Sequence, residues 1–279
     1  MGRIFVVLLV LLWLSGCASD GSSVQTQAEQ MSAESREQVL RSTDSREQLI
    51  TFYKQQLKER PSTQLRIKLI KAYLESGDTE SAAFHLAEVD MDEQYAAEIV
   101  FLKAQVAYLS ADYTLAYQYA QTALSLSSSY PEAENLMGLI QAERGKLSSA
   151  RAHFLAARRD YYDDAIIKNN LAVLDLIEEN YAAAVQKLQP LYVKSEGDRQ
   201  VTSNLLIAYS KLGKYQAVRE ILKEQHYPEE QIQSIFLKLR GMSSTGSHGA
   251  SEEISADSEE TSAALLQVKV ERGPEYESH

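Results

Sequence analysis

The chain has 279 residues, which is enough for one or two ordinary domains with a sizeable core. Its 39 acidic against 28 basic residues give a net charge of -11, and a chain this acidic is a poor candidate for binding nucleic acid or anionic lipid by charge alone. The single Cys excludes an internal disulfide and a cysteine metal cluster.

The first segment, residues 1–16, has the pattern of a secretory signal. Arg3 supplies one positive charge, and an unbroken apolar run follows from Ile4 to Leu14. A helix of this length rises only about 16 Å, whereas the hydrocarbon core of a membrane is about 30 Å thick. The run therefore has the length of a signal-peptide core rather than that of a membrane span.

Cys17 ends this segment in the sequence Leu14-Ser15-Gly16-Cys17, which resembles the bacterial lipobox. Small residues let a signal peptidase approach the backbone, and the thiol takes the diacylglyceryl group. We therefore predict cleavage before Cys17 and lipidation of Cys17; the alternative is an ordinary secretory signal with a chance Cys. In bacterial lipoproteins the residue after the lipidated Cys influences the membrane to which the protein is sorted. Here that residue is Ala18 and not Asp, which by resemblance implies the outer membrane. Two or three acyl chains would make this anchoring stable.

Two polar segments flank the body of the chain. Residues 17–43 are rich in Ser, Gln, Thr, Ala and Glu, and we expect a flexible tether that is weakly helical over residues 33–41. Residues 241–279 form an acidic tail that we expect to be disordered. The tail contains a short apolar stretch, residues 263–270, and the alternative is that this stretch docks on a partner or on the body.

The body, residues 44–240, repeats with a period of 34 residues. A turn position recurs at Gly77, Ala111, Gly145, Glu179 and Gly213. Five residues after each turn lies a small residue, namely Ala82, Ala116, Ala150, Ala184 and Val218. This pattern predicts helix-turn-helix hairpins, with a left-handed residue at the turn and small residues where the two helices touch. The period is that of the tetratricopeptide repeat (TPR). A generic Ala-rich helix bundle would not hold this phase across five units.

We therefore predict an all-α TPR solenoid, a right-handed superhelix whose repeats start near residues 63, 97, 131, 165 and 199. A solenoid needs a cap at each end with a polar outer face. Residues 44–60 supply the first cap, with Asp44 as the helix N-cap. Residues 228–240 supply the second, with Pro228 at the start of a helix.

No catalytic constellation is found. No two of the five His residues lie three or four residues apart, the spacing of a helical His pair that binds a metal, and no hydrolase or zinc-protease motif occurs. The paired carboxylates Asp163-Asp164 and Glu178-Glu179 fall at hairpin ends, where solvated charge is expected. We expect no enzyme activity, no cofactor, no metal and no small-molecule substrate.

The concave face offers the candidate binding groove. In TPR proteins the first helix of each repeat lines this face, and here its positions predict an apolar strip with two amides for a peptide backbone. The predicted groove residues are Phe101, Tyr108, Asn135, Leu139, Asn169, Val173, Leu176 and Ile207. The alternative is that neighbouring helices bury some of them. A helix or an extended segment of a partner protein is the expected guest.

Taken together, these features resemble the TadD family, the TPR lipoproteins of the tight-adherence (Flp) pilus assembly system. The matching residues are the lipobox, Asn169-Asn170-Leu171-Ala172 with Tyr181 and Ala184, and Ser203-Asn204-Leu205-Leu206 with Leu212-Gly213. The resemblance covers Cys17 to about Arg240 and excludes the acidic tail.

The resemblance implies a lipid-anchored, periplasm-facing scaffold at the outer membrane that assists the secretin, or its periplasmic partners, in assembling a type IVb-like pilus. Its TPR part is unspecific, because such repeats also occur in other envelope lipoproteins. The alternatives are therefore a pilotin-like lipoprotein of another pilus or secretion system, and an adaptor for peptidoglycan hydrolases.

Overall fold

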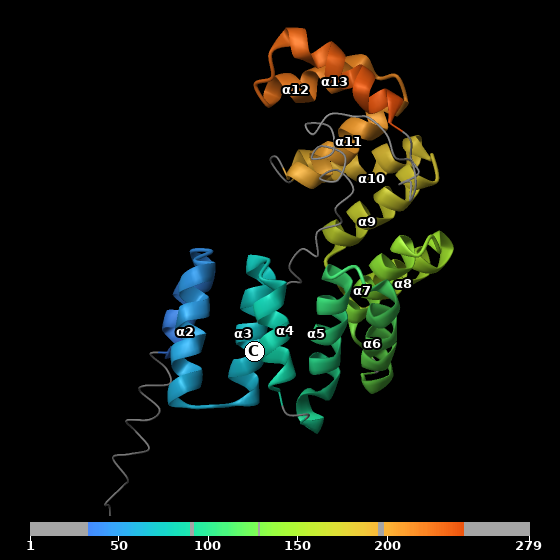
Figure 1. Ribbon diagram of the computed structural model, residues 1–279. Helices are drawn as coiled ribbons and strands as arrows, with labels where there is room; N and C mark the ends of the chain where they lie inside the picture. The colour runs from blue at the N-terminus through green and yellow to red at the C-terminus, as the bar shows by residue number, and fades with distance from the viewer. Residues whose placement is uncertain (1–32, 90–91, 128, 195–197, 243–279) are drawn as a thin grey trace, which may run out of the picture. The chain divides into compact units, whose positions relative to one another are not determined.

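The computed structural model describes residues 33–89, 92–127, 129–194 and 198–242. Within these ranges every regular element is a helix, and short turns join the helices (Figure 1). The expected all-α class is confirmed. The chain divides into two compact units, Met1–Asp78 and Thr79–His279, so the division falls inside the first predicted repeat.

In its described part, the first unit consists of a helix over residues 33–42, α2 (Arg46–Glu59) and α3 (Thr63–Ser76). One face of α2 is apolar and buries Leu49, Phe52 and Tyr53. The α3 helix begins after Ser62, whose hydroxyl accepts a hydrogen bond from the Leu65 amide at 3.2 Å. Such a cap satisfies one of the amides that a helix start leaves without a partner.

The start of α2 differs from the expected cap. Asp44 does not cap this helix; it has a left-handed φ of 49°, and its carboxylate pairs with Arg46 at 3.2 Å. Ser45 occupies the N-cap position without a side-chain cap bond. An Asp tolerates the left-handed conformation better than most residues do, which explains its place in the turn after residue 42.

Residues 33–42 form a helix that is part of the packed unit, whereas we expected them to be the weakly helical end of a flexible tether. The Glu37 carboxylate accepts hydrogen bonds from Tyr53 Oη at 2.7 Å and Lys68 Nζ at 2.9 Å, and it pairs with Arg41 at 3.3 Å. One carboxylate thus joins the helix of residues 33–42 to α2 and α3. Burial would raise the pKa of Glu37, but the hydrogen bonds from Lys68 and Tyr53 lower it below its ordinary value.

The described part of the second unit contains the remaining helices. They are α4 (Thr79–Ala87), the 3-10 helix η1 (Glu93–Tyr95), α5 (Ala96–Leu109), α6 (Tyr113–Leu126), α7 (Pro131–Glu143), α8 (Leu147–Arg159), α9 (Asp164–Ile177), α10 (Tyr181–Lys194), α11 (Arg199–Lys211), α12 (Tyr215–Glu224) and α13 (Glu229–Gly241). The pairs α5–α6, α7–α8, α9–α10 and α11–α12 begin within one residue of the predicted repeat starts at 97, 131, 165 and 199. The TPR architecture is therefore confirmed in this unit.

The hairpin turns carry the repeat register in their backbone angles. Residues 77, 111, 145, 179 and 213 all have a positive φ, between 59° and 83°. Three of them are Gly, whereas Ala111 and Glu179 adopt the same conformation with a side chain that makes it costly. The turn geometry is therefore set by the hairpin and not by glycine alone.

Small residues bring the two helices of each hairpin together, as predicted. Ala104 and Ala116 of the α5–α6 hairpin are completely buried, and so are Ala172 and Ala184 of the α9–α10 hairpin. The tightest case is Gly138 of α7, where an added Cβ would lie 2.4 Å from Cε1 of Phe154 in α8.

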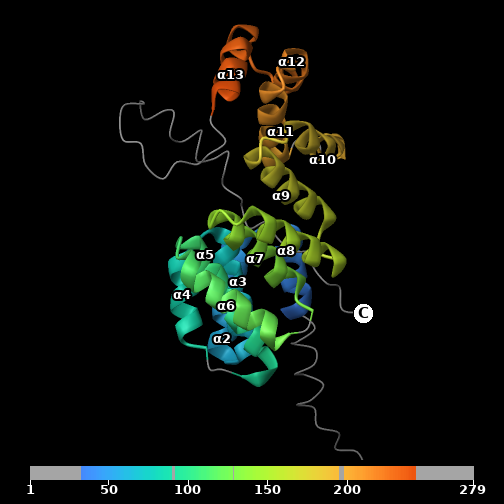
Figure 2. The ribbon, with the colours of Figure 1, turned by 90° about the vertical axis from the view of Figure 1, so that its right-hand side faces the viewer.

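Two apolar clusters run through the second unit. One spans α5 to α9, and the other spans α9 to α13. Figure 2 shows α11, α12 and α13 together at one end, where α13 closes the second cluster with Ile232, Phe236 and Leu239. The ring of Phe236 meets that of Tyr215 edge-on, with centroids 5.2 Å apart. Apart from Leu237, the exposed side chains of this terminal helix are polar, as a solenoid end requires.

Among the residues that the structure describes, no helix is both long enough and apolar enough to cross a membrane.

Candidate partner-binding surface

The eight predicted groove residues all lie on the first helices of repeats, but most of them are not open to solvent. Ile207 of α11 is partly exposed. The other seven expose 8% of their surface or less, namely Phe101, Tyr108, Asn135, Leu139, Asn169, Val173 and Leu176. The alternative reading, burial of these side chains within the chain, holds for all seven.

The two aromatic residues belong to the core, so the expectation of an exposed aromatic pair is wrong. Phe101 packs against Tyr130 with ring centroids 5.0 Å apart, and Tyr108 packs against Tyr113 at 5.7 Å. Both are members of the α5–α9 cluster. Burial, together with the nearby Glu143 carboxylate, raises the pKa of Tyr108 well above its ordinary range.

The asparagines bond to one another across successive repeats. Asn170 Nδ2 of α9 donates to Asn135 Oδ1 of α7 at 2.9 Å, and Asn204 Nδ2 of α11 donates to Asn169 Oδ1 of α9 at 3.0 Å. Because all four side chains are buried, each bond satisfies amide groups that would otherwise be costly. Asn135 and Asn169 therefore tie first helices together, where we had expected their amides to face a guest peptide.

A buried carboxylate of α9, Asp175, joins this helix to α8 and α10. Asp175 accepts hydrogen bonds from Arg151 of α8 at 2.9 Å and from Lys187 of α10 at 2.5 Å, and Arg151 also pairs with Glu178 at 2.7 Å. Burial would lower the pKa of Arg151, but Asp175 and Glu178 raise it. The charges are thus matched, as a buried carboxylate requires.

Sequence reasoning missed this network and the second half of each asparagine pair. A signal for both was present in the sequence. Asp175 interrupts the otherwise apolar run from Leu171 to Ile177, and Asn170 and Asn204 recur at the 34-residue period. A polar residue at a buried repeat position needs a partner, and the neighbouring repeat is the nearest source.

The described residues hold no group of three or more His, Cys, Asp or Glu side chains that could bind a metal ion. His153 Nδ1 lies 2.7 Å from a Glu134 oxygen and thereby joins α8 to α7. Cys17, the signal segment and the acidic tail lie outside the described residues, so lipidation stays a prediction.

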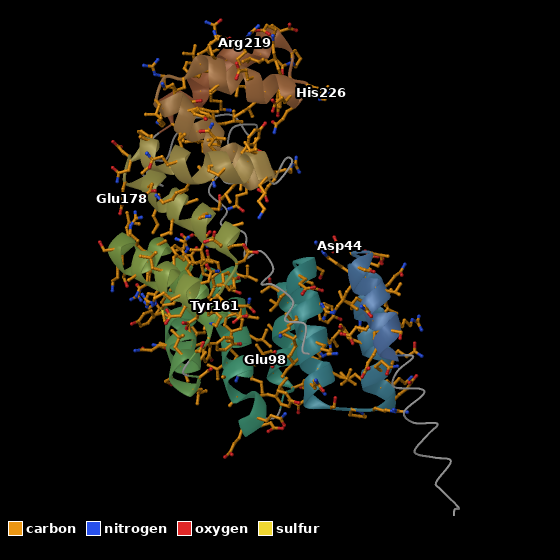
Figure 3. The ribbon with its side chains drawn as sticks, turned by 180° about the vertical axis from the view of Figure 1, so that it is seen from behind. Asp44, Glu98, Tyr161, Glu178, Arg219 and His226 are labelled. Atoms are coloured by element: carbon orange, nitrogen blue, oxygen red, sulfur yellow. The ribbon has the colours of Figure 1, made fainter. Side chains whose placement is uncertain are left out.

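Exposed apolar side chains remain outside the predicted groove. Tyr161, Val193 and Leu237 each expose more than half of their surface. Tyr161 lies in a left-handed turn between α8 and α9, before the start of α9. Glu178 lies just after the other end of α9; both residues are labelled in Figure 3. Leu237 lies on α13, which packs against α11, the helix that carries the partly exposed Ile207.

No protein-family model matches the sequence, and no curated protein matches it. Solved structures, however, are similar in fold. The chain is similar to PilF of Pseudomonas aeruginosa, with 18% identity and a TM-score of 0.55, over 74% of this chain and 96% of that one. It is also similar to a chain of the Cut9–Hcn1 hetero-tetramer of the APC/C, with 14% identity and a TM-score of 0.60 over 72% of this chain.

The chain covers 41% of the length of that second structure. Both structures are TPR-repeat proteins. At these identities the likeness shows the fold alone, and that fold is the TPR solenoid predicted from the 34-residue period.

Proposed function

We propose that this chain is a non-enzymatic scaffold that binds partner proteins during pilus assembly at the outer membrane. The observation that carries the proposal is the combination of a lipobox ending at Cys17 with five hairpin turns in strict 34-residue register. Stacked hairpins present long surfaces without a catalytic centre, which is how repeat proteins serve as binding scaffolds.

The pilus assignment has two supports. One is the resemblance of the sequence to the TadD family over residues 17–240. The other is the similar fold of PilF, a TPR protein of pilus assembly, almost all of whose length the chain covers. On this proposal the chain is held by lipid on Cys17, faces the periplasm and assists the secretin or its periplasmic partners in the tight-adherence (Flp) system.

The structure alters where a partner is expected to bind. Because Phe101 and Tyr108 are core residues, they are poor anchors for a guest. The partly exposed Ile207 and the more exposed side chains Tyr161, Val193 and Leu237 are better placed, since a partner can cover them without opening the core.

A second candidate is a pilotin-like lipoprotein of another pilus or secretion system, and the similarity to PilF supports it equally well. A third is an adaptor for peptidoglycan hydrolases. All three share the anchor and the scaffold, and they differ only in the partner.

Capture of cross-linked partners separates these candidates. A tagged chain is cross-linked in living cells, purified from solubilised outer membranes, and its partners are identified by mass spectrometry. Cys17→Ser cells, which lack the predicted anchor, provide the background control. Enrichment of a secretin or pilus-assembly protein of the Flp system is expected. Enrichment of peptidoglycan hydrolases alone would contradict the pilus proposal.

A further inference from the structure

The second unit ends in a basic patch at the root of the acidic tail. Lys211 Nζ, at the end of α11, donates hydrogen bonds to the carbonyl oxygens of Arg240, at 3.0 Å, and of Met242. These bonds hold the ends of α11 and α13 together. Lys238 and Arg240 in the last turn of α13 are exposed, and no carboxylate of the described residues pairs with either of them.

Apolar side chains lie beside these cations. Ile207 precedes Lys211 by four residues and shares its face of α11, while Leu237 precedes Arg240 by three residues and shares its face of α13. Leu237 exposes 55% of its surface. We name these five residues, Ile207, Lys211, Leu237, Lys238 and Arg240, the C-terminal patch.

The tail that follows has the complementary chemistry. Its apolar stretch, Ala263-Ala264-Leu265-Leu266-Gln267-Val268-Lys269-Val270, follows Glu259 and Glu260, whereas Glu271 on its other side lies between the cations Lys269 and Arg272. An apolar segment that follows two carboxylates matches apolar side chains beside cations, because Glu259 and Glu260 can pair with the cations while the apolar groups leave water. The nearest acidic residues of α13, Glu229 and Glu230, lie at its other end, where Glu229 is paired with Arg219 and Lys223.

The linker makes such a contact easy to populate. Residues 243–262 separate the end of the described body from the apolar stretch. If this linker is disordered, as its composition predicts, it has a root-mean-square span of about 25 Å, comparable to the length of α13, about 20 Å. A tether of this kind gives an effective concentration on the order of 1 mM. An intrinsic Kd of about 0.1 mM would then keep the segment docked roughly nine-tenths of the time.

We propose that residues 263–270 dock within the same molecule on the C-terminal patch. Leu265, Leu266 and Val268 cover Ile207 and Leu237, and the two preceding glutamates face Lys238 and Arg240. The tail is then a built-in ligand of the solenoid end, held by apolar burial and by charge.

Disulfide trapping tests this contact, because Cys17→Ser leaves the chain without any cysteine. Leu237→Cys and Leu266→Cys are added to the full chain in detergent, which is then oxidised with glutathione disulfide at several protein concentrations. We expect rapid formation of an intramolecular disulfide at a rate that does not change with protein concentration.

Two controls separate docking from random encounters. The first combines Leu265→Ser, Val268→Ser and Val270→Ser with the same two cysteines, which keeps the linker length but removes the apolar contact. In this variant the rate of intramolecular disulfide formation should fall by a factor of about five or more. The second moves the body cysteine to Val193→Cys, an exposed site on α10, and should also be slow. Equal rates in the serine variant, or disulfides formed only between molecules, would overturn the proposal.

Discussion

Single residues at the hairpin contacts decide whether two helices can approach, and Gly138 is the strongest case. We predict that Gly138→Ala lowers the free energy of unfolding by about 1–3 kcal/mol, because the new Cβ would lie 2.4 Å from the Phe154 ring and the core would be overpacked. Urea melts followed by circular dichroism measure the loss. Gly241→Ala is the matched control, since nothing lies within 4 Å of its added Cβ. Equal melts for the two variants would contradict the assigned contact.

The left-handed turns give a prediction of opposite sign. Ala111 has a φ of 59° and Gly145 has a φ of 71° at the equivalent turn. We expect Ala111→Gly to stabilise the chain by roughly 0.5–1 kcal/mol, because Gly removes the steric penalty at a modest entropic cost, and Gly145→Ala to destabilise it by a similar or larger amount. Thermal melts of the two variants check the sign. A loss of stability in Ala111→Gly would mean that the turn is not strained.

Phe101 tests whether the apolar strip is core or binding surface. Phe101→Ala should cost about 3–5 kcal/mol of stability, because the ring is 7% exposed and packs against Tyr130. Val193→Ala, at a side chain that is 74% exposed, should change stability by no more than about 0.5 kcal/mol. An unchanged melting temperature in Phe101→Ala would restore the reading of Phe101 as part of an open groove.

At the scale of helices, a partly buried charge joins the elements of the first unit. Glu37 joins three helices of the first unit through Tyr53 and Lys68. Its pKa is lowered in the folded chain, so its contribution to stability is present at neutral pH and above the unfolded pKa. That contribution is lost as the pH falls through the folded pKa.

Because the pKa of Glu37 is lowered, removal of its charge should destabilise the fold most at neutral pH. Glu37→Gln should cost about 1–3 kcal/mol at pH 7, because the amide replaces a charged acceptor of several hydrogen bonds. The difference from wild type should shrink as the pH falls through the lowered pKa of Glu37, because the wild-type carboxylate then becomes protonated. Urea melts over a series of pH values below 7 measure it. A difference that stays constant or grows toward low pH would show that the charge of Glu37 does not stabilise the fold.

What the sequence could predict at this scale depended on periodicity. The hairpins α5 to α12 follow from a turn residue and a small residue that recur every 34 positions. In the structure, the first helix of each hairpin begins within one residue of its predicted start. Weak helicity over residues 33–41 was expected, but the packing of this helix on α2 and α3 was not, because it depends on the contact of Glu37 with Lys68, 31 residues away, which no local pattern reports.

The candidate site was predicted less well for a related reason. The repeat position of a residue tells which helix carries it, but not whether an aromatic ring such as Tyr130 or a partner amide such as Asn170 covers it. Phe101 and Asn135 were therefore assigned correctly to first helices and incorrectly to an open groove.

At the scale of the whole molecule, the chain combines a predicted lipid anchor, a solenoid and an acidic tail. The solenoid supplies surface for protein partners, and on the proposed function the anchor would hold it where envelope machines assemble. If the proposed function is correct, activity depends on membrane anchoring through Cys17 as much as on partner binding, because a scaffold acts only where its partner proteins are located.

The most direct measurement of that account is the count of surface pili in cells whose only copy carries Cys17→Ser, alongside palmitate labelling and membrane fractionation. We predict a folded protein that takes up no label, is lost from the outer membrane, and supports few or no pili. Normal pilus numbers with an unlabelled, mislocalised protein would contradict the claim that this chain works as a lipid-anchored scaffold of pilus assembly.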